Sequence, residues 1–211
     1  MTILFCAAHP DDCVLSAGGT IAKLAKEGKK VALVIFSYGE GSDPLKEPQA
    51  ATIQRIKEAK RAFDVLGVHD TIFLSLSDLN FVAEIKDPST SKKFEDVLAK
   101  YNPTQIYAPS IGDPNSTHSS VSAFVREQIA KLQKKPEMYE FLVTPLFKLA
   151  RRSEPRIYID VSETIMLKRA ALELFKSLRP YISIYKTVRQ LNNWIAGFKS
   201  GTKYAEVFYK V

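Results

Sequence analysis

Short apolar runs alternate with longer amphipathic segments along this chain, and this alternation constrains the fold more than any other feature. The runs occupy residues 3–8, 31–36, 71–74, 105–108, 139–143 and 156–159, and a last one lies at residues 204–209. Each run is too short to be a helix, and several are rich in β-branched residues. Because the runs are nearly continuous in apolar character, they are typical of strands that are covered on both faces of a parallel sheet.

The segments between the runs carry apolar residues at the spacing of one helical face. They cover residues 14–25, 56–66, 94–98, 121–132 and 165–178, and the first two end at Gly28 and Gly67. Alternating strands and helices predict right-handed crossovers. The expected fold class is α/β, a three-layer doubly wound (Rossmann-like), mostly parallel sheet with helices on both faces. The length of 211 residues, without a repeat or linker, predicts a single domain over residues 1–211.

The charge pattern, the length of the apolar runs and the cysteine content argue against a nucleic-acid-binding, a membrane-spanning and a disulfide-rich protein. The net charge of +7 comes from Lys and Arg residues scattered among acidic ones, which is typical of solvated helices, so no nucleic-acid partner is expected. No apolar run reaches the roughly 20 residues that a membrane span needs, and the first run has no basic segment before it. Cys6 and Cys13 form no disulfide framework and fit a reducing compartment. We therefore expect a cytoplasmic protein with a small-molecule partner, and a homo-oligomer is compatible with the sequence.

The segment Ala-His-Pro-Asp-Asp-Cys at positions 8–13 is the strongest local signal for chemistry. It lies between the first predicted strand and the first predicted helix, at the sheet edge where open α/β folds bind ligands. Adjacent carboxylates repel each other unless a cation is near. His9 and Asp12 can converge on one ion, which leaves Asp11 to accept a proton. The alternative is a capped helix, in which Asp11 or Asp12 is the N-cap and His9 a turn residue.

A second polar segment follows the fourth predicted strand, at positions 113–118, and ends at His118. In a doubly wound sheet the first and fourth strands can be central neighbours, so His118 can approach His9 and Asp12. Two histidines and one carboxylate form a typical catalytic zinc set with an open position for water. The same ligands also suit Fe²⁺ or another divalent ion.

With these residues in place, the sequence resembles the LmbE-like (PIG-L) family of metal-dependent N-acetylglucosaminyl deacetylases. The resemblance rests on His-Pro-Asp-Asp at 9–12 with Gly18 and Gly19, and on Asp113 with His118. Further matches run nearly end to end: Tyr-Gly-Glu-Gly at 38–41, Arg-Ile-Lys-Glu-Ala at 55–59, Leu-Gly-Val at 66–68, Phe-Leu at 73–74 followed by Asp78, and Tyr-Ala-Glu-Val-Phe at 204–208.

The resemblance implies a zinc-dependent hydrolase that removes an N-acetyl group from an N-acetylglucosamine-containing small molecule or glycoconjugate. It assigns His9, Asp12 and His118 as metal ligands and Asp11 as the general base. It also implies that Arg55 and Asp78 contact the sugar. From the sequence alone, Arg55 can equally form a salt bridge on a helix face and Asp78 can equally be a turn residue.

Two departures from the family pattern bear on catalysis. Cys13 stands where the family has Glu, and Asn115 stands where it has the first His of a His-x-x-His pair. Asn115 can donate a hydrogen bond to an oxyanion but cannot act as an acid. The alternative function is therefore a metal-containing sugar-binding protein with weak or lost deacetylase activity. A basic nucleic-acid or phosphosugar binder is a third reading, without a Gly-x-Gly-x-x-Gly or Walker loop to support it. His69 is expected at the opposite sheet edge and outside the site.

Overall fold

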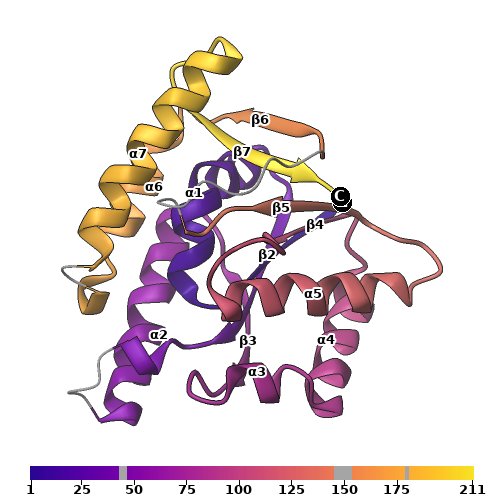
Figure 1. The fold of residues 1–211 in the computed structure, drawn as a ribbon. Coiled ribbons are helices and arrows are strands. Elements are labelled where there is room, and N and C mark those ends of the chain that lie inside the picture. The colour runs from indigo at the N-terminus through magenta and orange to yellow at the C-terminus, as the bar shows by residue number, and fades with distance from the viewer. Residues whose placement is uncertain (43–46, 145–153, 179–180) are drawn as a thin grey trace.

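The computed structural model describes residues 1–42, 47–144, 154–178 and 181–211. Its described part contains a seven-stranded sheet in the order β3-β2-β1-β4-β5-β7-β6 (Figure 1). Six strands run in the same direction, and β7 runs antiparallel to both of its neighbours. The strands are β1 (Thr2–Ala7), β2 (Lys30–Ser37), β3 (Asp70–Leu76), β4 (Gln105–Pro109), β5 (Glu137–Phe141), β6 (Arg156–Asp160) and β7 (Ala205–Lys210).

Helices cover both faces of the sheet, so the predicted three-layer α/β fold is confirmed (Figure 1). Alternate residues of β1 point to opposite faces: Ile3 and Phe5 pack beneath α1, α2 and α6, and Leu4 and Cys6 pack beneath α3, α4 and α5. The helices are α1 (Pro10–Lys26), α2 (Pro48–Val65), α3 (Phe81–Glu84), α4 (Pro88–Tyr101), α5 (Ser116–Ala130), α6 (Ile165–Leu172) and α7 (Tyr181–Ser200), with short 3₁₀ turns η1 (Glu40–Ser42) and η2 (Lys176–Leu178).

The strand order positions the functional edge. β1 pairs with β2 on one side and with β4 on the other, so the sheet reverses its winding direction at β1 and β4. The loops that leave β1 and β4 therefore lie next to each other at the carboxyl edge, as the sequence predicts.

Three features of the helices differ from the sequence prediction. The expected helix at 165–178 is divided into α6 and η2, and neither the short helix α3 nor the 20-residue helix α7 is predicted. In α7 the polar residues Arg189 and Asn193 are buried, whereas Leu191, Trp194 and Phe198 are exposed. The apolar residues of α7 nevertheless recur at helical spacing, so the helix is amphipathic, with much of its apolar stripe exposed and polar residues on its buried face. None of the helices in the described residues has the length and apolar character to cross a membrane.

The glycine pair at the centre of α1 lets this helix approach the segment before α6. A Cβ atom on Gly19 would lie 2.8 Å from Cβ of Val161, and one on Gly18 would lie 3.0 Å from Cγ of Lys168. The backbone N–H groups of Gly19 and Thr20 also donate to the buried carboxylate of Glu206. The close approach fixes the position of α1, and so of the histidine and aspartates at its first turn.

Candidate metal centre

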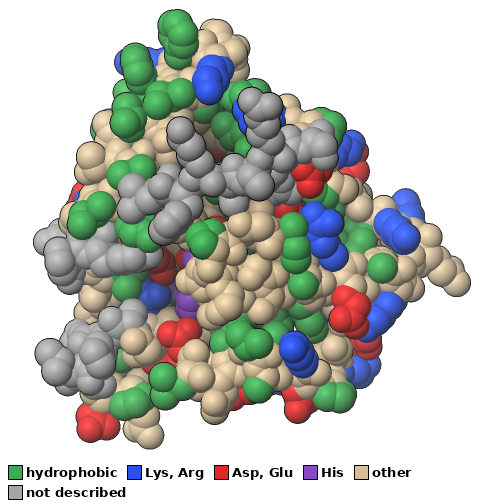
Figure 2. Space-filling model, in the orientation of Figure 1, with side chains coloured by type: hydrophobic (Ala, Val, Ile, Leu, Met, Phe, Trp, Pro, Cys, Tyr) green, Lys and Arg blue, Asp and Glu red, His purple; other side chains and the backbone are tan. Residues whose placement is uncertain are grey.

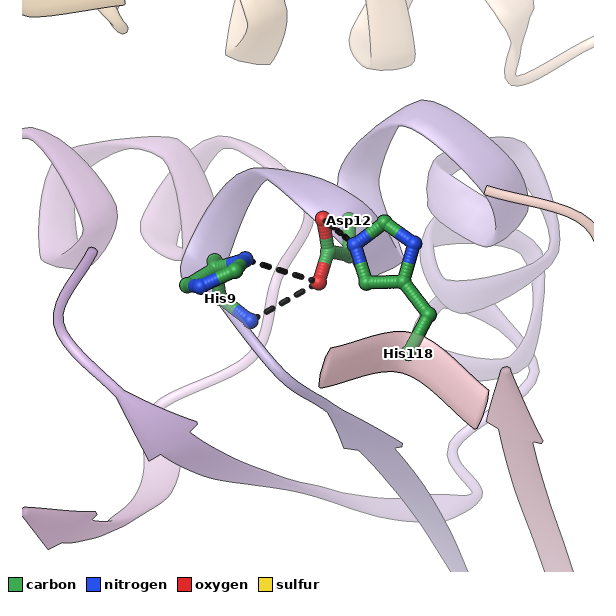
Figure 3. A group of neighbouring side chains, drawn as sticks. All are labelled: His9, Asp12 and His118. Carbon is green, nitrogen blue, oxygen red and sulfur yellow. Dashed lines mark hydrogen bonds and ion pairs between the residues drawn. The ribbon is translucent and has the colours of Figure 1, made fainter. Parts of the chain in front are cut away.

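Three side chains from two sheet-edge loops converge on one point. His9 is the N-cap of α1, Asp12 lies in its first turn, and His118 lies in the first turn of α5. Each offers one ligand atom, and these atoms lie within 4.8 Å of one another (Figure 3). The Asp12 carboxylate lies between the rings: Oδ2 is 3.5 Å from Nδ1 of His9, and Oδ1 is 3.4 Å from Nε2 of His118. The convergence of His9, Asp12 and His118 that the sequence predicts is present.

The alternative reading of residues 9–12 as a capped helix is partly correct. The N-cap is His9 rather than either aspartate, and Asp12 accepts the backbone N–H of His9 at 2.8 Å. That bond satisfies a donor at the helix start and also fixes the carboxylate between the two rings. Capping and metal binding are therefore compatible at Asp12.

Each imidazole also contacts a further carboxylate through its other ring nitrogen. Nε2 of His9 lies 2.7 Å from Oδ1 of Asp78, and Nδ1 of His118 lies 3.0 Å from Oδ1 of Asp113. We call Asp78 and Asp113 the outer carboxylates. Metal-binding histidines usually have such a partner, because it fixes the tautomer and the ring orientation. The two carboxylate–histidine pairs leave Nδ1 of His9 and Nε2 of His118 facing the common point.

The outer carboxylates are held in different ways. Asp113 accepts hydrogen bonds from the backbone N–H groups of Asn115, Val143 and Thr144 and from the Thr144 hydroxyl. Asp78 is positioned through its backbone N–H, which donates to Glu40. A Cβ on Gly41 would lie 2.8 Å from Oδ2 of Asp78, so this glycine makes room for the carboxylate.

The carboxylates determine the charge of the two imidazoles. Burial alone would lower the pKa of His9, but Asp12 and Asp78 outweigh it and raise the pKa to about 10. Burial opposes protonation of His118 too, yet Asp12 and Asp113 raise its pKa to about 9. In turn, the pKa of Asp12 is lowered because both histidines outweigh the effect of burial. Without a metal ion, His9 and His118 are therefore protonated, and their positive charges take the place of the charge of a bound cation.

Asp11 is not among the three converging groups, and its carboxylate is paired. Its Oδ1 accepts a hydrogen bond of 2.9 Å from Nη2 of Arg55, whose side chain is buried and whose Nε donates to the carbonyl of Tyr38. Gly39 has a φ of +74°, and a Cβ there would lie 2.5 Å from Nη2 of Arg55. Nη1 of Arg55 has no hydrogen-bond partner among the described residues. Arg55 is therefore buried in the site and not part of a salt bridge on the helix face.

Asn115 is the N-cap of α5. Its Oδ1 accepts the backbone N–H and the hydroxyl of Thr117, at 2.9 and 2.8 Å. The side chain is exposed, and within the described chain its amide nitrogen donates no hydrogen bond. The cap thus fixes the oxygen and leaves the amide donor available.

Two residues singled out by the sequence lie apart from the converging groups. Cys13 is buried, and its Sγ donates to the carbonyl of Pro10 at 3.3 Å. Burial, reinforced by Asp12 and Asp11, raises the pKa of this thiol, so it is held in the neutral form. His69 is exposed and pairs with Asp64 at the opposite sheet edge.

The sequence did not reveal how the outer carboxylates act. It included Asp113 only as part of the family motif. The position of Asp113 in a loop, five residues before His118, could have indicated that its carboxylate contacts this histidine. The resemblance implies that Asp78 contacts the sugar, and the structure adds a contact between this carboxylate and His9 that the sequence did not predict. Seen from outside, histidine surface is visible in a narrow hollow with acidic and basic side chains beside it (Figure 2).

Comparisons with known proteins find a matching family and solved structures with the same fold. The family model described as PIG-L, GlcNAc-PI de-N-acetylase, matches residues 4–129. The Escherichia coli K12 protein named uncharacterized deacetylase YaiS is 30% identical over 125 residues, which are 56% of this chain and 63% of that protein. This match spans less than two thirds of the relative. A diacetylchitobiose deacetylase of Thermococcus kodakarensis is 24% identical over 221 residues, covering 97% of this chain and 80% of the relative.

Solved structures share the whole fold. The N,N'-diacetylchitobiose deacetylase of Pyrococcus horikoshii has a TM-score of 0.83 at 22% identity and covers 100% of this chain and 83% of that chain. GalB, the 4-carboxy-2-hydroxymuconate hydratase of Pseudomonas putida KT2440, has a TM-score of 0.84 at 22% identity, covering 100% and 95%. The same fold therefore occurs in a hydratase and in deacetylases, so the fold alone does not choose the reaction.

Proposed function

Because the chain belongs to the PIG-L family of GlcNAc-PI de-N-acetylases, we propose that it is a metal-dependent deacetylase that acts on an N-acetylglucosamine-containing molecule. The reaction is hydrolysis of a linear amide, which yields acetate and a free amino sugar. The relatives support this class of substrate, since several are deacetylases of diacetylchitobiose or of an inositol-linked acetamido sugar.

One observation carries the proposal: two imidazoles and a carboxylate converge, and each imidazole has an outer carboxylate behind it. His9, Asp12 and His118 are the residues that would hold a divalent ion. Zn²⁺ suits this nitrogen and oxygen donor set, and Fe²⁺ or another divalent ion suits it too. When bound, such an ion lowers the pKa of water toward about 7 and polarises a carbonyl.

Asp11 is the proposed general base. It takes the proton of the attacking water and later returns it to the nitrogen of the departing amine, so that no net proton is gained. Arg55 holds Oδ1 of Asp11 and leaves the other carboxylate oxygen to exchange the proton. Both partners of this ion pair are almost fully buried, which keeps the carboxylate in one orientation.

Two sequence-based assignments are kept as narrower proposals. Nη1 of Arg55 has no hydrogen-bond partner among the described residues and is the donor that we assign to the sugar. The amide nitrogen of Asn115 is the donor that we assign to the oxyanion as the carbonyl is attacked. Asp78 contacts the ring of His9, so we propose that its main role is to orient this ring. A contact with a hydroxyl group of the sugar would be its second role.

The test is an acetate-release assay on protein loaded with Zn²⁺ or Fe²⁺. Diacetylchitobiose, N-acetylglucosamine and an inositol-linked N-acetylglucosamine serve as substrates, and 4-carboxy-2-hydroxymuconate serves as the hydratase control. Release of one acetate per amine formed supports the proposal. Turnover of the hydratase substrate alone would contradict it.

The alternative is a sugar-binding protein in which Asn115 marks weakened catalysis. It predicts that Asn115→His raises the rate of acetate release by about 10-fold or more, because the histidine supplies an acid. A deacetylase adapted to Asn115 would instead lose activity or stay unchanged. A single domain over residues 1–211 and a cytoplasmic location remain sequence predictions, which limited proteolysis and cell fractionation would test.

A further inference from the structure

A cavity of about 230 Å³ lies apart from the metal centre, between α7 and the outer strands β6 and β7. None of the three converging residues, the outer carboxylates, Asp11 or Arg55 lines it. Its polar lining includes Ser16 of α1 and Asn193 of α7, and the polar groups that bear on its charge are Arg156, Tyr158, Arg189, Asn192, Lys199 and Tyr209.

The lining is positively charged. Arg156, Arg189 and Lys199 contribute three cationic side chains, and no described lining residue is Asp or Glu. The guanidinium of Arg156 lies over the ring of Tyr209, with 5.9 Å between its carbon and the ring centroid. Like charges around one cavity repel each other, so an occupant of opposite charge would stabilise the arrangement.

Arg189 is the least expected member of this group, because only 9% of it is exposed. Its Nη2 donates to the carbonyls of Leu142 and Val143 at 2.6 and 2.8 Å. No described carboxylate lies within ion-pair distance of it, and its Nε has no described hydrogen-bond partner. The two carbonyl contacts explain where the side chain lies, and the carboxylates of Glu206 and Asp113 act on its charge only from beyond ion-pair distance. Burial lowers the pKa of Arg189 to about 10.

The other polar groups indicate what the anion is attached to. Asn192 is half-buried in the lining, and its amide makes no hydrogen bond within the described chain. Amides beside tyrosine rings suit hydroxyl-bearing ligands, and arginine matches the oxygens of a phosphate group. Three cations in so small a space suit a dianion better than a single carboxylate.

We propose that this cavity binds a small phosphate-bearing molecule, with Arg156, Arg189 and Lys199 around the phosphate and Asn192 beside the group that carries it. The site is separate from the metal centre and independent of the deacetylase reaction proposed above.

The test is a titration of the metal-loaded protein with inorganic phosphate, glucose 6-phosphate, glucose and acetate, followed by calorimetry. The expected result is saturable binding of both phosphates and none of glucose or acetate. Tighter binding of glucose 6-phosphate would assign the site to a phosphorylated sugar, and equal binding would assign it to free phosphate. Absence of saturable phosphate binding, or equally tight binding of acetate, would overturn the proposal.

Substitutions of residues that line the cavity test whether phosphate binds there. Arg156→Gln and Lys199→Gln alter exposed ends of the lining, and each is expected to weaken phosphate binding by about 5-fold or more. The matched control is Lys203→Gln, an exposed lysine over Tyr204 outside the cavity lining, which should leave binding within about 2-fold. His118→Ala excludes phosphate bound at the metal centre. Binding that is lost in His118→Ala, or unchanged in both cavity variants, would place the phosphate elsewhere.

Discussion

The two halves of the metal centre are built from the same pair of groups but are held very differently. The His118 half consists of His118 and Asp113, whose side chains are 5% and 0% exposed. The His9 half consists of His9 and Asp78, whose side chains are 15% and 17% exposed. Asp113 accepts two backbone N–H groups just after β5, whereas Asp78 is positioned by a loop after β3 and by Glu40. The His118 half is therefore the more rigid one, and the His9 half is the more exposed one.

The largest effect should come from removing a ligand of the rigid half. We expect His118→Ala to weaken metal binding on the order of 1,000-fold and to abolish turnover, because no neighbouring donor replaces the ring. Competition with a chelator of known affinity measures the loss. His69→Ala is the matched control, since His69 is the remaining histidine and is exposed. Equal metal affinity in the two variants would remove His118 from the centre.

The second effect separates proton transfer from metal binding. We expect Asp11→Asn to keep metal affinity within about 2-fold and to lower kcat by about 100- to 10,000-fold, because the amide cannot accept a proton. Metal titration and steady-state kinetics on the same preparation measure both quantities. If metal affinity fell as far as kcat, Asp11 would belong to the ligand set and not to the proton path.

Variants of the two outer carboxylates test whether the His118 half is held more rigidly than the His9 half. Asp113→Asn should weaken metal binding by about 100-fold and also lower the free energy of unfolding by about 2 kcal/mol, because several buried donors lose a charged acceptor. Asp78→Asn should weaken metal binding by about 10-fold with less than about 0.5 kcal/mol of destabilisation. Urea denaturation and metal titration of both variants check this. Equal losses would show that the two halves are equally rigid.

A smaller effect is the dependence of stability on pH. In the metal-free protein the pKa values of His9 and His118 are raised from 6.5 to about 10 and about 9. Their contribution to stability is fully present below pH 6.5 and is lost as the pH rises through these values. Metal binding should show the opposite slope, because the ion displaces the same protons. Denaturation of chelator-treated protein across this range measures the first slope, and His118→Ala should flatten it. A metal-free protein that gained stability with rising pH would contradict the assignment.

The sequence predicts those parts of the site whose residues are close together in the chain, or whose position follows from the order of the strands in the sheet. His9, Asp11 and Asp12 lie in one turn, and His118 follows from the pairing of β1 with β4. The contact between His9 and Asp78 spans 69 positions. It joins the segment after β1 to the segment after β3, two strands that do not pair with each other, and strand patterning does not reveal how such segments meet. The pairing of Asp11 with Arg55 likewise depends on how α2 packs.

The same limit explains what the sequence missed in the fold. The sheet and its covering helices were predicted because their apolar patterns are continuous or one-sided. Helix α7 was missed although its apolar residues recur at helical spacing. It buries Arg189 and exposes Trp194, so the face that packs on the sheet is not its apolar face. Apolar patterning alone therefore does not indicate how this helix packs.

X-ray absorption spectroscopy at the metal edge, joined to elemental analysis of the loaded protein, tests the proposed metal centre most directly. We expect one divalent ion per chain with two imidazole nitrogens and one carboxylate among its ligands, and loss of that ion in His118→Ala. An ion without imidazole ligands, or a full complement of ion in His118→Ala, would contradict it.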